Sequence, residues 1–212
     1  MKIAIIIGAT GMVGKQLLLQ LLASHDYTEI KSLVRRTSGV EHPNLTEHII
    51  DFDKPSEWKG IIIGDVLFSC LGTTIGQAKT KEEQYKVDYT YQYNAAKIAS
   101  ENKVATYVLV SSAGANARSS TFYMRMKGEL DDAIQLLPFK TTIILRPGQL
   151  AGERTENRLG EKIGLSVMYG LNKLGLFKKF RPIMDCQVSR AMVVAAGNEM
   201  SEIYTLDELF KI

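Results

Sequence analysis

The chain has 212 residues, a length typical of one α/β domain, and its 45% hydrophobic and 23% charged residues are typical of a globular protein. The formal net charge of +3 is too small to indicate a nucleic-acid partner. Cys70 and Cys186 lie far apart in the sequence, which favours a reducing compartment over a disulfide framework, and the three histidines show no metal-ligand spacing with them. We therefore expect a cytoplasmic protein with no metal site and no nucleic-acid partner.

Neither a membrane span nor a secretion signal is expected. No stretch reaches the roughly 18 apolar residues that a span needs. An apolar run follows Lys2, but Gly8 and Gly11 interrupt it where the core of a signal peptide would continue.

The first predicted element is a buried parallel strand over residues 3–7, followed by a glycine turn that opens a helix. The turn has the spacing G-x-x-G-x-x-G. One glycine makes the turn, one lets the backbone approach a pyrophosphate, and one lets the helix pack closely on the strand. The alternative is an ordinary strand–turn–helix, but the context that a nucleotide site requires is present on both sides. The residues expected to hold the cofactor here are Gly8, Thr10, Gly11, Met12, Val13 and Gly14.

Strands and helices alternate along the next 130 or so residues. The predicted strands cover residues 29–34, 48–50, 65–70, 105–110 and 141–145, and the predicted helices cover residues 16–23, 82–102 and 121–137. This alternation predicts a Rossmann-like α/β fold, a doubly wound parallel sheet of strand order 3-2-1-4-5-6. We expect one domain over residues 1–212 with a small C-terminal elaboration, in which residues 150–185 serve the substrate or form a lid.

The end of the second predicted strand carries Arg35 and Arg36 where an enzyme specific for NAD usually has an acidic residue. An arginine pair suits the 2′-phosphate of NADP(H), and the alternative is a solvated basic pair. After the third predicted strand, Asp51 or Asp53 could accept a hydrogen bond from the adenine amino group, or serve as an ordinary loop or helix-cap aspartate.

A possible catalytic set combines Ser112 with Tyr123 and Lys127. The tyrosine and the lysine are four residues apart on a predicted helix and so share a face, and Ser112 follows the preceding strand. A tyrosine hydroxyl can donate a proton to a carbonyl oxygen, and a nearby ammonium lowers its normal pKa of about 10. The pattern Tyr-x-x-x-Lys also occurs by chance in helices, so its register after the glycine turn and the serine pair is what favours catalysis.

With these motifs the sequence resembles the short-chain dehydrogenase/reductase superfamily, and within it the atypical branch of Tat-interacting-protein-like oxidoreductases. The resemblance covers about residues 1–155. It is carried by Gly8-x-x-Gly11-x-x-Gly14, Cys70-Leu71-Gly72-Thr73-Thr74, Val87-Asp88, Ser111-Ser112-Ala113-Gly114-Ala115, Tyr123-x-x-x-Lys127, Lys127-Gly128-Glu129 and Arg146-Pro147-Gly148.

The resemblance implies an NADP(H)-binding Rossmann fold, with Tyr123 as the acid/base, Lys127 on the nicotinamide ribose and Ser112 polarising the carbonyl. It implies further cofactor contacts at Arg35, Arg36, Leu71, Gly72, Pro147 and Gly148. We also expect Asp51, Phe52 and Thr73 to line the cofactor site. The chain departs from the family at one position. Many relatives use an asparagine on the long helix as a fourth catalytic residue, and neither Asp88 nor Asn94 can be assigned that role from the sequence.

We expect an NADPH-dependent reductase of a small aldehyde or ketone. The rival interpretation is a dinucleotide-binding regulator that senses NADP(H) and binds a protein partner without turnover. A nucleotide-sugar epimerase is a third, weakened because only about sixty residues follow the sixth strand. The apolar and basic segment of residues 160–181 is interpreted as a core helix, a lid or, least favoured, a membrane-surface helix. Neither the substrate nor the oligomeric state follows from the sequence.

Overall fold

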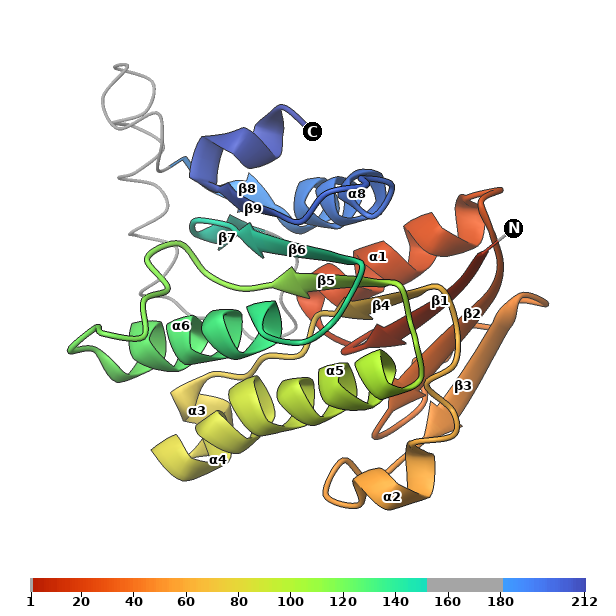
Figure 1. Cartoon of the computed structure of the whole chain (residues 1–212), viewed down its shortest axis with the longest axis horizontal. Helices are drawn as coiled ribbons and strands as arrows, with labels where there is room; N and C mark the ends of the chain where they lie inside the picture. The colour runs from red at the N-terminus through yellow and green to blue at the C-terminus, as the bar shows by residue number, and fades with distance from the viewer. Residues whose placement is uncertain (1, 152–180) are drawn as a thin grey trace.

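The computed structural model describes residues 2–151 and 181–212 of the chain. Its centre is a seven-stranded, fully parallel sheet of order β3-β2-β1-β4-β5-β6-β9 (Figure 1). The strands are β1 (Lys2–Ile7), β2 (Tyr27–Val34), β3 (Leu45–Ile49), β4 (Val66–Ser69), β5 (Thr106–Val110), β6 (Thr141–Arg146) and β9 (Glu202–Thr205). The six predicted strands and their order are thereby confirmed, and β9 adds a seventh strand beside β6.

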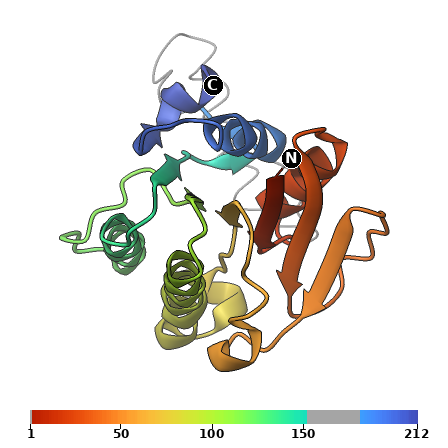
Figure 2. The same cartoon turned by 45° about the vertical axis from the view of Figure 1, so that its right-hand side comes forward.

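Helices cover both faces of the sheet, as Figure 2 shows from a second direction. The helices and helical turns are α1 (Met12–Ala23), α2 (Pro55–Trp58), α3 (Ile75–Ala78), α4 (Lys81–Tyr85), the π-turn η1 (Lys86–Thr90), α5 (Tyr91–Glu101), α6 (Phe122–Gln135), α8 (Asp185–Ala195) and the 3-10 turn η3 (Leu206–Phe210). The long helix predicted over residues 82–102 is present as α4, η1 and α5 in continuous succession. None of the helices in the described part of the chain is long and apolar enough to cross a membrane.

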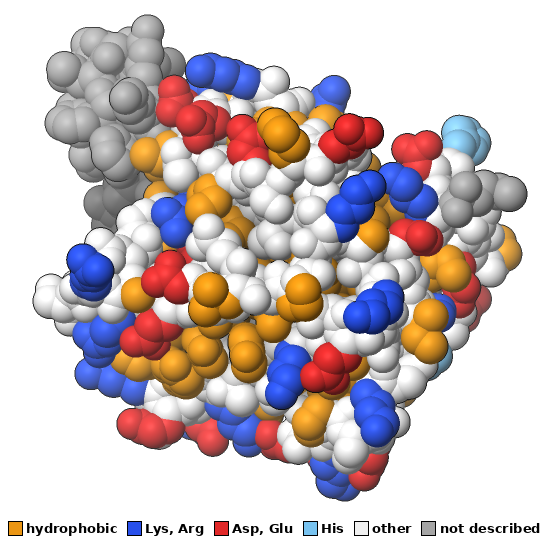
Figure 3. All heavy atoms as spheres, in the orientation of Figure 1, with side chains coloured by type: hydrophobic (Ala, Val, Ile, Leu, Met, Phe, Trp, Pro, Cys, Tyr) orange, Lys and Arg blue, Asp and Glu red, His pale blue; other side chains and the backbone are white. Residues whose placement is uncertain are grey.

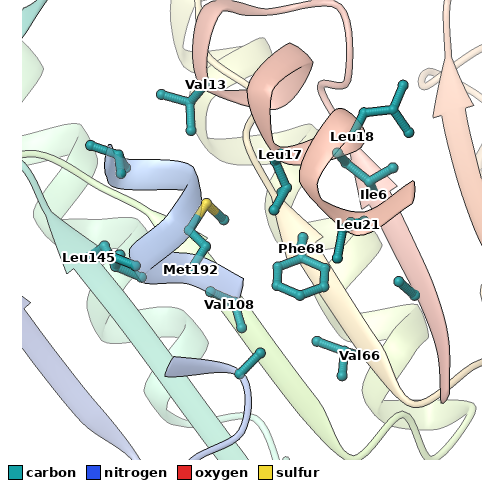
Figure 4. Packing of buried hydrophobic residues seen from close by; sticks show 14 of the residues in the cluster. Ile6, Val13, Leu17, Leu18, Leu21, Val66, Phe68, Val108, Leu145 and Met192 are labelled. Atoms are coloured by element: carbon teal, nitrogen blue, oxygen red, sulfur yellow. The ribbon is translucent and has the colours of Figure 1, made fainter. Parts of the chain in front are cut away.

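Two hydrophobic cores, one on each face, explain why the central strands β1 and β4 are apolar almost throughout. On one face α1 and α8 pack on the sheet, with Leu17, Phe68 and Met192 at the centre (Figure 4). On the other face, α5 and α6 cover alternate residues of the same strands, such as Leu67 and Ile144. All four residues of β4 are buried because both sides of that strand are covered. The outer surface of the α5 and α6 layer carries hydrophobic side chains interspersed with charged ones (Figure 3).

The residues after 181 complete the sheet. Helix α8 follows the short β7–β8 pair, Leu150–Ala151 with Ile183–Met184, and leads into β9, which runs parallel to β6. The chain therefore adds a further β–α–β unit at the C-terminal side. The expected lid or substrate elaboration of residues 150–185, and the three interpretations of residues 160–181, fall almost wholly on residues 152–180, outside the described residues.

Candidate functional site

In the glycine turn between β1 and α1, the packing of the backbone leaves no room for a side chain at two of the glycines. Gly8 has a φ of +86°, and a Cβ atom there would lie 2.5 Å from the carbonyl carbon of Cys70. A Cβ atom on Gly14 would lie 2.0 Å from the carbonyl oxygen of Gly8. Both contacts are with backbone that cannot move aside, so the close packing of β1, α1 and the end of β4 excludes any side chain at these positions.

Gly11 is different, because the protein leaves space beside it. It is exposed, has a φ of −80°, and a Cβ atom would meet nothing closer than the Gly8 carbonyl oxygen at 3.3 Å. It is the N-cap of the 12-residue α1 and makes no side-chain capping hydrogen bond, so backbone N–H groups at the helix start are available to an anion. This cradle fits a dinucleotide pyrophosphate. Beside it Thr10 is exposed, Met12 is half-buried and Val13 packs into the core, which leaves the backbone of Val13 for the cofactor.

Arg35 and Arg36 directly follow β2 at the same edge of the sheet, and both are exposed. Within residues 2–151 and 181–212 no carboxylate forms an ion pair with either guanidinium. The loop after them is fixed by Glu47 on β3, which accepts hydrogen bonds from the Thr37 hydroxyl at 2.6 Å and the Ser38 N–H at 3.1 Å. Partial burial opposes ionisation of Glu47, but these hydrogen bonds outweigh it and lower its pKa. The arginines are thus held on an ordered loop as free cations.

Most side-chain groups of residues 51–53, the segment predicted to contact the adenine, already make contacts within the protein. The Phe52 ring is buried and stacks on Tyr91 with 5.3 Å between ring centroids, so only the backbone of Phe52 remains for a cofactor. An oxygen of Asp51 accepts the Asp53 N–H at 3.0 Å. Asp53 in turn accepts hydrogen bonds from Lys86 and Tyr91, and the bond from Lys86 lowers the pKa of Asp53. These contacts favour the interpretation of Asp51 and Asp53 as ordinary loop aspartates over a role for either in binding the adenine.

The loops after β4 and β6 converge on the same edge of the sheet. Leu71, Gly72 and Thr73 follow β4, and the Thr73 N–H donates to Asp88 Oδ2 at 2.8 Å. After β6, the buried Pro147 accepts a hydrogen bond from the Ala113 N–H at 2.8 Å, which joins this loop to the one after β5, and the half-buried Gly148 follows it. The structure therefore gathers the residues predicted to line the ribose and the carboxamide on one edge of the sheet.

Helix α6 places Tyr123 and Lys127 one turn apart with opposite degrees of burial. The Tyr123 side chain is exposed, whereas Lys127 is buried. The loop after β5 is pressed against this helix, because the Asn116 N–H donates to the Met124 carbonyl at 3.0 Å. A Cβ atom on Gly128 would lie 2.2 Å from the Asn116 carbonyl carbon, so the glycine of the Lys-Gly-Glu motif permits this close contact.

The two serines after β5 have different environments. Ser111 is buried beside Asp131, whereas Ser112 is half-buried, and its hydroxyl is directed to the Ala113 carbonyl at 3.4 Å. Ser112 is therefore the serine of the pair with access to the site, while Ser111 belongs to the interior.

The lysine of the site has a buried carboxylate partner that the sequence did not assign. Asp88 Oδ1 lies 3.2 Å from Lys127 Nζ, with 1% and 4% of the two side chains exposed. Burial by itself lowers the pKa of Lys127, but the charge of Asp88, assisted by Tyr123 and Asp131, outweighs it and raises that pKa. Asp131 is held in turn by Arg146, with Nε and Oδ2 2.8 Å apart. The ammonium is thus kept charged within an interior network of alternating charges.

Asp88 lies buried in the π-turn η1, from which it pairs with the lysine. The Gln92 amide donates to the Asp88 carbonyl at 2.7 Å and accepts from the buried Ser69 hydroxyl at 2.7 Å, which ties the turn to β4. Single π-turns of this kind are frequent at functional sites. Asn94, the other candidate for the missing family asparagine, lies on α5 beyond the turn, and in the described part of the chain it makes no hydrogen bond with Lys127 or Tyr123.

A cavity of about 420 Å³ opens beside the tyrosine, between the start of α4 and the start of α6. Its lining residues are Thr73, Thr74, Ile75, Lys81, Gln84, Phe122 and Tyr123. Its volume is within the range of small-molecule sites, which is about 300–1,000 Å³. The exposed side of Tyr123 therefore faces a space that a small substrate can fill.

A family profile described as NAD(P)H-binding matches residues 8–166, three quarters of the chain. The chain belongs to this NAD(P)H-binding family. Two relatives are similar over most of their length: the mitochondrial protein FMP52 of Candida albicans, 41% identical over 76% of this chain and 73% of its own, and the mitochondrial protein FMP52-1 of Scheffersomyces stipitis, 37% identical over 91% and 87%.

Solved structures with the same fold include NAD-bound proteins. The enzyme WbmH of Bordetella bronchiseptica, in complex with NAD⁺, matches with a TM-score of 0.73 at 15% identity over 96% of this chain and 75% of that one. A short-chain dehydrogenase/reductase superfamily protein of Agrobacterium tumefaciens with bound NAD matches with a TM-score of 0.70 at 12% identity over 96% and 77%. The family profile confirms the predicted NAD(P)-binding domain, and these structures share its Rossmann-like fold with the short-chain dehydrogenase/reductase superfamily that the sequence resembles.

The expected location was wrong. The curated relatives are named as mitochondrial proteins, which points to mitochondria and not to the cytoplasm. Cys70 and Cys186 are both free thiols, an observation that does not distinguish one reducing compartment from another.

Proposed function

We propose that this protein reduces a small aldehyde or ketone with NADPH, and that Ser112, Tyr123 and Lys127 carry the reaction. One observation supports this proposal above the others. Tyr123 lines a cavity of substrate size, while the charged ammonium of Lys127 is buried one helical turn away. A proton donor open to the substrate and a fixed positive charge behind it are what acid-assisted carbonyl reduction needs.

When bound, NADPH supplies the hydride that adds to the carbonyl carbon. The Tyr123 hydroxyl gives its proton to the carbonyl oxygen, which becomes the hydroxyl of the product alcohol. The ammonium of Lys127 stabilises the tyrosinate that remains, until the tyrosine takes a proton from water. The Ser112 hydroxyl donates a hydrogen bond to the carbonyl oxygen and so orients it toward Tyr123.

Residues on the nucleotide side support NADPH in preference to NADH. Arg35 and Arg36 are exposed cations without carboxylate partners in the described part of the chain, and Glu47 orders the loop that follows them. A guanidinium pair matches the geometry and charge of a 2′-phosphate. Gly8, Thr10, Gly11, Met12, Val13 and Gly14 would surround the pyrophosphate, and Lys127 would also contact the nicotinamide ribose.

One observation favours a second candidate, a regulator that binds NADP(H) without turnover. Asp88 already pairs with the Lys127 ammonium. This ion pair partly neutralises the charge of Lys127 and leaves fewer of its three N–H donors for a tyrosinate and a ribose. A protein that only senses the dinucleotide would need no free lysine.

The two candidates differ in what Tyr123→Phe does. For a reductase, kcat falls by about 10²–10⁴-fold because the proton donor is lost, while NADPH affinity changes little because the ring remains. The measurement is loss of NADPH absorbance with a panel of small aldehydes and ketones, together with titration of NADPH fluorescence. Tyr93→Phe is the matched control, since Tyr93 is a half-buried tyrosine on α5 away from the cavity lining. Turnover that survives Tyr123→Phe contradicts the proposed mechanism, and tight NADPH binding with no turnover of any carbonyl favours the regulator.

A further inference from the structure

The cavity beside Tyr123 has two apolar walls. Ile75 at the start of α3 and Phe122 at the start of α6 are large hydrophobic side chains that line it, and Ile75 is 51% exposed. An exposed isoleucine next to an aromatic ring offers apolar surface that water covers poorly, so a ligand with an apolar body gains by covering it.

The neutral polar groups of the cavity lie toward the loop after β4. Gln84 is 5% exposed and lines the cavity, and its side-chain amide donates to the Thr73 carbonyl at 3.3 Å. Thr73 is in turn fixed by its N–H bond to Asp88. These groups therefore form a rigid polar end next to Tyr123, where a carbonyl group would be held.

Among the described residues that line the cavity, Lys81 carries the single charge, and it is positive. Lys81 Nζ lies 5.7 Å from the centroid of the Phe122 ring, a cation–π distance that keeps the ammonium at the cavity. None of the lining residues within 2–151 and 181–212 is acidic. Glu82 and Glu83 follow Lys81 in the sequence, but neither lines the cavity, and in the described part of the chain no carboxylate lies within ion-pair distance of Lys81.

We infer that the substrate is a small carbonyl compound with an apolar body and an anionic group, and that Lys81 selects it. This inference rests on the proposed reductase function. The carbonyl oxygen lies at Tyr123, the apolar body lies between Ile75 and Phe122, and a carboxylate pairs with the free ammonium of Lys81. The reaction stays the same: the carbonyl carbon takes a hydride from NADPH, the oxygen takes the Tyr123 proton, and the carboxylate is unchanged in the product alcohol.

Two substrates of similar size test the inference, 4-carboxybenzaldehyde and 4-methylbenzaldehyde. The quantity to follow is the ratio of their kcat/KM values at saturating NADPH, compared between protein variants so that the intrinsic reactivities of the two aldehydes cancel. Lys81→Met should lower this ratio by about three- to tenfold, the effect of a partly exposed charge pair, and Lys81→Arg should keep it. Raising the salt concentration from 50 to 500 mM should lower the ratio in the parent protein and leave it unchanged in Lys81→Met.

Lys97→Met is the matched control. Lys97 is an exposed lysine on α5 that does not line the cavity, so this change removes the same charge and should leave the ratio as it is in the parent. A ratio that is the same in Lys81→Met as in the parent overturns the inference. A ratio that falls equally in Lys97→Met overturns it as well, because the effect would then come from net charge alone.

A binding measurement separates failure of this inference from failure of the reductase function. The product 4-(hydroxymethyl)benzoate and the neutral 4-methylbenzyl alcohol are titrated calorimetrically into the protein with NADP⁺. Tighter binding of the acid that is lost in Lys81→Met supports the anion site even if no aldehyde is reduced. Turnover of both aldehydes without any dependence on Lys81 supports the reductase and overturns the anion site.

Discussion

The glycine turn after β1 and the Tyr123–Lys127 side of α6 lie along the same edge of the sheet. The first presents backbone groups to a ligand, and the second presents side chains. The turn offers backbone, and its glycines are dictated by how closely β1, α1 and the end of β4 approach one another. The α6 side offers side chains, and it depends on an interior charge network that links Asp88, Lys127, Asp131 and Arg146. The glycine turn should be sensitive to a side chain added at Gly8 or Gly14, whereas the α6 side should be sensitive to the loss of one member of the Asp88–Lys127 ion pair.

The largest effect is expected within the turn itself, from two alanine substitutions that separate packing from binding. Gly14→Ala places a Cβ atom 2.0 Å from the Gly8 carbonyl oxygen, and we expect a loss of about 4 kcal/mol or more in the free energy of unfolding. Gly11→Ala meets its nearest atom at 3.3 Å, so the fold should survive while NADPH affinity falls at least about tenfold. Urea unfolding and fluorescence titration measure the two effects. Equal stabilities of the two variants would contradict the distinction drawn between these glycines.

The next largest effect is expected from breaking the charge network. Asp88→Asn leaves the Lys127 ammonium buried without its partner, and we expect a loss of about 3 kcal/mol in the free energy of unfolding, at the lower end of the usual range because asparagine can still accept from Thr73. The double variant Asp88→Asn/Lys127→Met removes both charges and should be no less stable than Asp88→Asn alone. Urea unfolding of the parent, both single variants and the double variant gives the coupling. Additive losses would show that the two side chains do not depend on each other.

The smallest effect is expected at the nucleotide end of the site. In Arg35→Ala/Arg36→Ala the preference for NADPH over NADH should fall by about ten- to hundredfold, since each charge-assisted contact contributes about 1.5–3 kcal/mol and the two arginines share one phosphate. NADH affinity serves as the internal control and should change little. Titration of both cofactors by nicotinamide fluorescence is the measurement. A parent protein that binds both cofactors equally would contradict this assignment before any variant is made.

The sheet could be predicted from the sequence because its central strands are covered on both faces and are therefore apolar almost throughout, as in β1 and β4. The edge strand β9 was not predicted, since only one of its four residues, Ile203, is aliphatic, and none of the four is buried. The four-residue helices α2 and α3 are too short to show a helical period.

The candidate site was predictable where it depends on local spacing. The interval between Tyr123 and Lys127 is read directly from the sequence, and so is that of the glycines. The pairing of Asp88 with Lys127 could not be predicted from the sequence. It joins two separate helical segments, and Asp88 lies in a π-turn, which gives no periodic signal in the sequence. Val87-Asp88 was already among the motifs that carry the family resemblance. That motif was the only sequence signal that could have identified Asp88 as a residue of the site. The burial of the Phe52 ring against Tyr91 also depends on tertiary packing.

The contact between α1 and α8 has a consequence for synthesis of the protein. The Gln20 amide donates to the Cys186 carbonyl at 3.0 Å and to the Ser189 hydroxyl at 2.7 Å, and Leu17 and Leu21 share a core with Met192 (Figure 4). On the ribosome, the sheet strands that follow α1 in the sequence can cover part of its apolar face, but the part that packs on α8 stays uncovered until residues some 166 positions later have been made. At about 5–20 residues per second this interval lasts on the order of 10–30 s. During that time the nascent chain exposes hydrophobic surface of the kind that chaperones recognise, so α1 is fully covered only after α8 has packed against it.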